Sequence, residues 1–555
     1  MKPRLVTASI GAAGLLGLLL VPLEGCTNLD ETPPSLITSS NFFRNEAEVL
    51  AGLAGVYAQL RSTAPEGTIY DANEVSSDEI VVPIRGSDWN DNGQWIDLHN
   101  QTWSPTSAAT TNFFNGAWNN AYTGVARANL FLSAVKGATF ANKASVIAEG
   151  RALRAFYYYI LLDMFGGVPI VTTTDIAQRP RSTRHELFTF IESELIAARD
   201  SGLPATRSQS DNGRFTQGGA DAILANMYVN AGVFTKEGAG SGGISASSYN
   251  SCSGVAVAAG PDACLAADSA ATRLINSPYY HLADSFPQNF RADNASSPEN
   301  IFVVKFIAAD GLGLDVIMSG LHYNQFSPTP WNGFATLAQT YNSFDPADKR
   351  RQVVLIGPQS NVLTGAPVTD RQGAPLVFSD TINYILSATE GEGPRIYKWP
   401  ADPTHIGPNN GNDYAWFRLG EMYLIAAEVE NELGHTGTAL NLLNALRNRP
   451  GAPVAAPLAS VDHSVILNER LFELLGEGKR RQDLIRFGSY TARTDSTSAL
   501  VGGKGCIVVT PPAPARPYCS GWTHSTADYR VLFPIPQSQI DANAQLKQNP
   551  GYTGP

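Results

Sequence analysis

Three of the eight tryptophans fall in one stretch without helical periodicity, which reads IVVPIRGSDWNDNGQWIDLHNQTW at 80–103. A flat aromatic ring can stack on the apolar C–H face of a sugar, while amide, carboxylate and guanidinium groups bond its hydroxyls. We therefore predict that residues 85–95 form a binding loop for a hydroxylated ligand. The candidate contact residues in this loop are Arg85, Trp89, Asn92 and Trp95.

A second candidate loop reads HYNQFSPTPWNGF at 322–334 and mixes aromatic rings with side-chain amides. Its two prolines stiffen the backbone, and a preordered loop binds at a lower cost in entropy. The candidate contact residues here are Tyr323, Asn324 and Trp331. For Trp89 and Trp95 of the first loop, the alternative is packing, either onto the helices or against a partner protein.

Two carboxylates one helical turn apart, Glu473 and Glu477, have the residue types that acid–base catalysis uses. Basic residues surround them, and Glu477 and Arg481 stand at the i,i+4 spacing of an ion pair. We favour the structural interpretation, a salt-bridge network.

Sequence motifs for catalysis and metal binding are missing. There is no HExxH, GxSxG or Walker loop. Asp78 with Glu79, and Asp345 with Asp348, lack the regularly spaced oxygen ligands of a calcium loop. We predict no catalytic residue, no metal and no cofactor. With 50 acidic residues, however, the sequence cannot exclude a pair of carboxylates that would cleave a glycosidic bond.

Helical periodicity recurs along the chain and supplies the elements that position these loops. Alanine and glycine at the helix-crossing positions allow close approach, which resembles tetratricopeptide packing. Short β-prone runs at 301–305, 376–379 and 395–399 alternate with turn residues between 236 and 412. The predicted helices are 113–134, 144–165, 185–199, 219–234, 413–433, 438–447 and 463–487.

The composition excludes several classes of protein. The 555 residues are 43% hydrophobic and 16% charged, with a net charge of −11. This is too apolar for a disordered chain and too acidic for a typical nucleic-acid binder. Only one long apolar run is present, at the N-terminus, so the chain is no polytopic membrane protein.

The N-terminus has the pattern of a lipoprotein signal peptide. Lys2 and Arg4 precede an apolar segment that is too short to span a bilayer and ends in Leu-Glu-Gly-Cys at 23–26. This resembles a bacterial lipobox, so we predict removal of residues 1–25 and lipidation of Cys26. An ordinary signal peptide is the alternative. Asp30 and Glu31 resemble an acidic signal for export to the cell surface.

Four further cysteines fall as two local pairs, in segments rich in Gly, Ala, Pro and Ser. In an exported protein such pairs indicate loop-closing disulfides rather than a zinc site. We predict one disulfide between Cys252 and Cys264 and another between Cys506 and Cys519.

Four segments in this order, behind a lipobox, resemble the SusD/RagB family of outer-membrane nutrient-binding lipoproteins. They are ALRAFYYYILLDMFGGVPIV at 152–171, RLGEMYLIAAEVENELG at 418–434, LNERLFELLGEGKRRQDLIRFG at 467–488 and LFPIPQSQIDANAQLKQNPGY at 532–552. The resemblance covers essentially the whole mature chain. It implies a non-catalytic protein that captures oligosaccharide, or in some members peptide, for import. It also implies a SusC-like TonB-dependent barrel as partner. A carbohydrate-active enzyme and a protein-only adaptor are the alternatives.

The predicted fold is mainly α, a tetratricopeptide-like helical-repeat scaffold with a long irregular loop-rich insertion that contains short β-strands. We place the mature chain, 26–555, in a single SusD-like domain, with two independent domains as the alternative. The scaffold occupies about 41–235 and 411–490, the loop-rich variable region about 236–410, and a C-terminal segment 491–555.

Overall fold

The computed structural model describes residue 43, residues 45–239, 242–491 and 527–552, and the backbone of 508–509 and 516–517. Helices dominate these ranges, and the strands are short. Within the same ranges, every helix is either too short or too polar to cross a bilayer. Cys26, Cys506 and Cys519 lie outside the described residues, so the lipid anchor and the second disulfide stay predictions.

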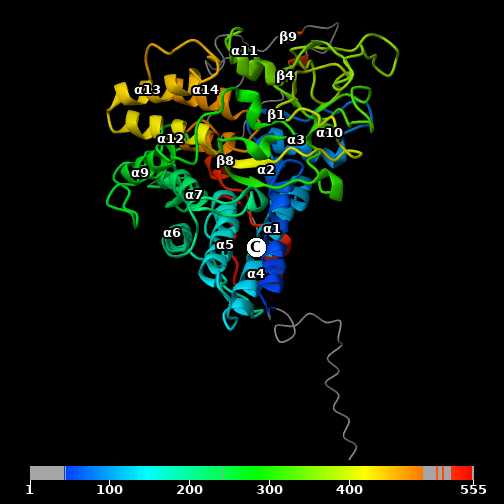
Figure 1. Cartoon of the computed structure of the whole chain (residues 1–555). Coiled ribbons are helices and arrows are strands. Elements are labelled where there is room, and N and C mark those ends of the chain that lie inside the picture. The colour runs from blue at the N-terminus through cyan, green and yellow to red at the C-terminus, as the bar shows by residue number, and fades with distance from the viewer. Residues whose placement is uncertain are drawn as a thin grey trace, which may run out of the picture. The chain divides into compact units, whose positions relative to one another are not determined.

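The scaffold is a series of helices in which sequence neighbours pack side by side, such as α4 with α5, α5 with α6 and α12 with α13 (Figure 1). Close approach depends on small residues, since a Cβ at Gly124 of α4 would lie 2.5 Å from the Tyr157 ring of α5. The scaffold helices are α1 Glu46–Ala58, α4 Asn115–Val135, α5 Lys143–Phe165, α6 Arg184–Ser201, α7 Gln217–Val229, α8 Ala231–Phe234, α9 Ala263–Ile275, α12 Leu419–Glu432, α13 Thr436–Arg447, α14 His463–Leu474 and α15 Arg480–Arg486.

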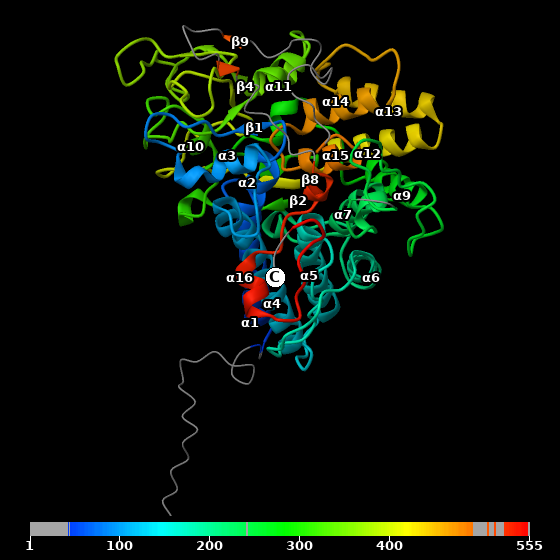
Figure 2. The same cartoon turned by 180° about the vertical axis from the view of Figure 1, so that it is seen from behind.

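Short antiparallel strand pairs join parts of the chain. They are β1 Ile80–Val81 with β3 Ala335–Thr336, β2 Asn300–Val304 with β8 Tyr414–Arg418, β4 Val354–Leu355 with β7 Arg395–Ile396, β5 Gly357–Pro358 with β6 Val377–Phe378, and β9 Val508–Val509 with β10 Arg516–Pro517. The β1–β3 and β2–β8 pairs link segments more than 100 residues apart. The remaining helices are α2 Thr68–Val75, α3 Gln94–His99, α10 Val316–Gly320, α11 Ala338–Ser343 and α16 Gln537–Ala542. Seen from behind, α16 lies beside α4 (Figure 2), and Gln539 bonds Asn115 there at 2.8 Å.

Three of the predicted helices differ from the observed structure. The segment 219–234 divides at Asn230 into α7 and α8. The segment 413–433 begins as strand β8, whose apolar residues pair with β2, and becomes helical only at Leu419. The segment 463–487 breaks into α14 and α15, because Gly476 and Gly478 adopt φ values of +73° and +75° that helices do not contain. The prediction of one continuous helix across this segment is therefore wrong.

The break redirects the charged side chains of this segment into a buried network. Glu473 contacts three guanidinium groups, at 2.6 Å from Arg449, 2.7 Å from Arg418 and 3.0 Å from Arg350. These four side chains are at most 1% exposed. The structural interpretation of Glu473 is confirmed.

The expected ion pair between Glu477 and Arg481 is wrong, because the two residues no longer share a helix. Glu477 pairs instead with Arg418 and Lys398, and Arg481 pairs with Asp163 at 3.2 Å. Glu477 therefore belongs to the same buried network.

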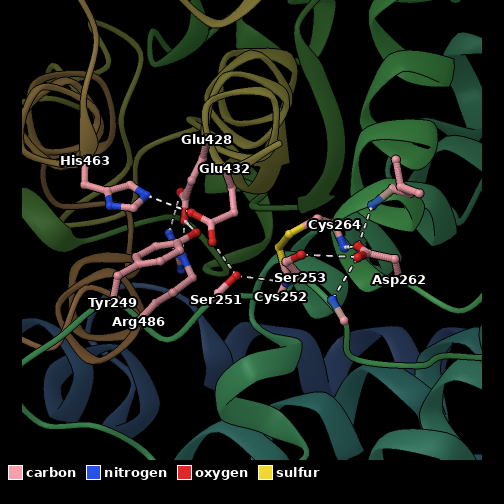
Figure 3. Close-up of a disulfide and its surroundings, with 12 residues drawn as sticks. Tyr249, Ser251, Cys252, Ser253, Asp262, Cys264, Glu428, Glu432, His463 and Arg486 are labelled. Atoms are coloured by element: carbon pink, nitrogen blue, oxygen red, sulfur yellow. Dashed lines mark hydrogen bonds and ion pairs between the residues drawn. A yellow bond between two sulfur atoms is a disulfide. The ribbon is translucent and has the colours of Figure 1, made fainter. Parts of the chain in front are cut away.

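The predicted disulfide between Cys252 and Cys264 is confirmed (Figure 3). Asp262 closes the same loop by polar contacts. Its carboxylate accepts hydrogen bonds of 2.8 Å from the N–H groups of Cys264 and Gly254, and so caps the N-terminus of α9. On the other side of the bridge, Ser251 donates a 2.5 Å hydrogen bond to Glu432 of α12. The loop is thereby fixed between α9 and α12.

Candidate ligand-binding site

The strand pair β1–β3 brings the two predicted binding loops together. Ile80 pairs with Thr336 and Val81 with Ala335, so the chain that leaves β1 runs beside the chain that enters β3. The indole N–H of Trp89 then donates a 2.8 Å hydrogen bond to the backbone carbonyl of Trp331. Two loops separated by more than 200 residues in sequence thus form one surface.

An aromatic cluster supports this surface from below. The Trp89 ring centroid lies 5.6 Å from that of Trp95 and 5.9 Å from that of Phe334, and Trp95 packs 4.7 Å from Phe113. Gly333 leaves room for the indole, since a Cβ there would lie 2.2 Å from Trp89. This packing fixes the position of the two loops relative to the scaffold.

The 85–95 loop has an unusual backbone. Trp89, Asp91 and Asn92 all adopt left-handed conformations, with φ values of 65°, 39° and 56°. Such conformations cost about 1–3 kcal/mol each and persist only where the surroundings impose them. One such constraint is the hydrogen bond of 2.8 Å from the Trp95 indole to Asp91. The loop is thus held in a fixed shape by its own side chains.

Two of the predicted contact residues are interior, which corrects their assignment. Arg85 is 1% exposed, and its guanidinium donates to the carbonyls of Thr389 and Glu392. Trp95 is 6% exposed within the aromatic cluster. Both side chains hold the loop in place, and neither reaches a ligand at the surface.

The other predicted residues reach the surface to different extents. Trp331 is 41% exposed, and Asn92 and Asn324 are also exposed. Tyr323 and Trp89 are half-buried. The Trp331 backbone is fixed by a 2.6 Å hydrogen bond from its N–H to a carbonyl of helix α10. This leaves a positioned indole face open to solvent beside polar groups.

A third loop, 359–376, completes the site and was not predicted. It approaches through Asn324, whose side-chain N–H donates to the carbonyl of Thr369 at 2.7 Å. Arg371 of this loop lies over the Tyr323 ring, with its Cζ 4.1 Å from the centroid. The loop contains no aromatic residue and no recognisable motif, so its sequence did not indicate that it belongs to the site.

Charged groups beneath Tyr323 fix its hydroxyl and the Arg371 guanidinium. Tyr323 donates a 2.5 Å hydrogen bond to Asp88, and its burial and this bond raise the pKa of Tyr323 to about 12. Glu390 accepts from the Arg371 backbone at 3.0 Å and lies 3.0 Å from His322. Although burial opposes it, these contacts and the guanidinium lower the pKa of Glu390 to about 2. The tyrosine is thus neutral and Glu390 ionised at neutral pH.

The exposed groups of the site have the chemistry of a surface that binds a sugar. In the described part of the chain, no group of three or more His, Cys, Asp or Glu side chains is arranged to hold a metal ion. The exposed groups offer a ring face, amides, a guanidinium and a carboxylate, which together match the apolar face and hydroxyl rim of a sugar.

A pH-sensitive carboxylate lies beneath the site, on helix α2. Burial and the nearby Asp315 and Glu74 carboxylates raise the pKa of Asp71 to about 8, and Glu66 also lies within electrostatic reach. In the unfolded chain the pKa of an aspartate is ~4. At pH values between the unfolded and the folded pKa, only the folded protein keeps the Asp71 proton. The free energy of unfolding therefore falls as the pH rises through this range.

We therefore expect the apparent Tm of Asp71→Asn to decline less between pH 5 and pH 8 than that of the wild type. Thermal unfolding followed by circular dichroism at several pH values measures this. Asp293→Asn, at a carboxylate with 70% of its side chain exposed, is the control and keeps the wild-type slope. An unchanged or steeper slope for Asp71→Asn would contradict the assignment.

Comparison with known proteins places this fold in one family. A family model described as "SusD family" matches residues 289–552, and one described as "Starch-binding associating with outer membrane" matches 29–229. The chain is 25% identical to the starch-binding protein SusD of Bacteroides thetaiotaomicron, over the full length of both. It is 23% identical to the SusD-like protein P2 of Formosa agariphila, over 96% of this chain and 98% of the relative.

Solved structures share the fold over nearly the whole chain. A laminarin-binding SusD-like protein matches with a TM-score of 0.65 and 24% identity, covering 92% of this chain and all of the other. Surface glycan-binding protein A from Bacteroides thetaiotaomicron, in complex with laminarihexaose, matches with a TM-score of 0.66 and 21% identity, over 91% and 99%.

The chain therefore belongs to the SusD-like proteins, and the predicted family and mainly helical fold are confirmed. Three of these relatives are named for binding starch, laminarin or surface glycan, and none of the three names denotes an enzyme.

Proposed function

We propose that this protein is a cell-surface lipoprotein that binds oligosaccharide and hands it to a SusC-like TonB-dependent transporter. The observation that carries the proposal is the exposed Trp331 ring, on loops that also carry Tyr323, Asn324 and Asn92 and that belong to a SusD-like fold. The names of the relatives, which include starch-binding and laminarin-binding proteins, support a glycan as the ligand.

Glycan arrays and peptide arrays probed with the purified protein test this proposal. Saturable binding to a glycan supports it, and binding to peptides alone moves the ligand to the other class that the family resemblance implies. Release of reducing ends from a glycan would favour a carbohydrate-active enzyme instead. Co-purification with a barrel but no ligand on either array would favour a protein-only adaptor.

Membrane attachment is proposed to depend on the lipid at Cys26. Because acyl chains bury many methylene groups in the bilayer, their loss removes the anchor. We expect Cys26→Ala to move from the outer-membrane fraction to the soluble fraction, as measured by cell fractionation and immunoblotting. Cys26→Ala that stays in washed membranes from cells lacking the barrel partner would contradict lipid anchoring.

A further inference from the structure

Arg371 stands at the edge of the candidate site with unused hydrogen-bonding capacity. Its side chain is 48% exposed and lies over the Tyr323 ring, with Cζ 4.1 Å from the ring centroid, where a cation is attracted to the ring. The Nε group is paired with Glu390, and Nη1 is 3.5 Å from Asp88 Oδ2. Among the described residues, no carbonyl or side-chain oxygen accepts from Nη2.

An exposed acceptor lies beside this donor. Asp88 has 37% of its side chain exposed, and its Oδ2 accepts from Tyr323. The only contact of Oδ1 among the described residues is a long one, 3.5 Å from the Ser87 hydroxyl. A guanidinium N–H and a carboxylate oxygen side by side match two neighbouring hydroxyls, of which one accepts and the other donates a hydrogen bond.

This polar pair adjoins the exposed aromatic ring. Asp88 directly precedes Trp89, and the Trp89 indole N–H bonds the backbone carbonyl of Trp331 at 2.8 Å. The Arg371–Asp88 pair and Trp331 are therefore linked through Trp89. The two halves of the site come from three loops, which the Tyr323–Asp88 and Asn324–Thr369 hydrogen bonds hold together.

Ion pairing leaves no free cation for an anionic ligand. The Arg371 guanidinium faces two carboxylates, Asp88 and Glu390, and burial lowers the pKa of His322. The positive charge of Arg371 is thus already compensated, so a uronate or sulfate finds no unpaired positive charge there.

We propose that Arg371 is a ligand-binding residue of this site and that, with Asp88, it takes an uncharged glycan through a pair of adjacent hydroxyls. This inference rests on the proposed function and names the class of glycan.

Affinity gel electrophoresis tests it with four polymers: soluble starch and laminarin as uncharged glycans, and polygalacturonate and alginate as anionic ones. We expect the wild type to be retarded by at least one uncharged polymer and by neither anionic one. Retardation should not change between 20 and 500 mM NaCl, since salt screens interactions between charges.

The variants separate the role of Arg371 from a general loss of the site. Arg371→Ala and Arg371→Lys are both expected to weaken binding about 5-fold to 10-fold, because an ammonium cannot replace the planar guanidinium. Arg291→Ala is the matched control, at an arginine with 53% of its side chain exposed that pairs with a nearby aspartate, and it should bind like the wild type.

The possible failures are distinguishable. If Arg371→Ala binds like the wild type while Trp331→Ala loses binding, the role of Arg371 is overturned and the proposed function stands. If an anionic polymer retards the wild type more strongly than the uncharged polymers do, the assignment of an uncharged glycan is overturned. A wild type that no polymer retards overturns this inference, and if the glycan array is also blank the proposed function fails with it.

Discussion

Replacing Trp331 with alanine is expected to lower glycan affinity at least 10-fold without lowering the apparent Tm by more than about 1 °C. The ring is 41% exposed, so its removal leaves no large cavity in the core. Exposed aromatic anchors of this kind carry much of the energy of a binding surface, with losses of about 2 kcal/mol or more on truncation. Isothermal titration calorimetry with the glycan selected by the array measures the change.

The matched control for this variant is Tyr279→Ala. Tyr279 is 50% exposed and lies outside the three loops of the site, beyond helix α9. We expect its affinity and stability to equal those of the wild type. Unchanged affinity for Trp331→Ala, with intact folding, would remove Trp331 from the ligand surface.

The largest expected effect on stability is that of Glu473→Gln. This residue pairs with Arg350, Arg418 and Arg449, and all four side chains are at most 1% exposed. Removing one partner from a buried ionic network costs about 3–5 kcal/mol, because the remaining charges stay desolvated. With an unfolding entropy of about 2 cal/mol/K per residue, the apparent Tm should fall by roughly 3–5 °C.

Differential scanning calorimetry measures this change, with Asp293→Asn as the control at an exposed ion pair. The three guanidinium groups, despite burial, lower the pKa of Glu473 below its ordinary value. Its contribution is therefore present above the pKa of the unfolded group and disappears only on strong acidification. A melting temperature within 1 °C of the wild type would show that the network adds little to stability.

Most scaffold helices were predictable because they carry an apolar face with a 3.6-residue period. The 144–165 prediction and the observed Lys143–Phe165 helix agree to one residue. Strand β8 was missed because YAWFR is buried at every position, and an apolar run of five residues has no period that separates strand from helix. Its partner β2 lies more than 100 residues away, and local sequence does not report such pairing.

Residue chemistry selected the two loops of the candidate site, but not which of their side chains face outward. The two loops were identified by their aromatic and amide content. The β1–β3 pairing that joins them is a long-range contact, which local sequence does not indicate. Arg85 and Trp95 have side chains of the types that bind sugars, but both are buried because they hold the loop in place. No feature of the sequence around Arg371 indicated a binding residue, because its position over the Tyr323 ring is set by the folded structure.

The central claim is that this surface holds a glycan and leaves it intact. One sample can test it: titrate the wild type with the array-selected oligosaccharide in the calorimeter, incubate the mixture overnight, and then measure reducing ends. The account predicts saturable binding that Trp331→Ala weakens, with no increase in reducing ends. Absence of binding, or new reducing ends that rise with protein concentration, would contradict it.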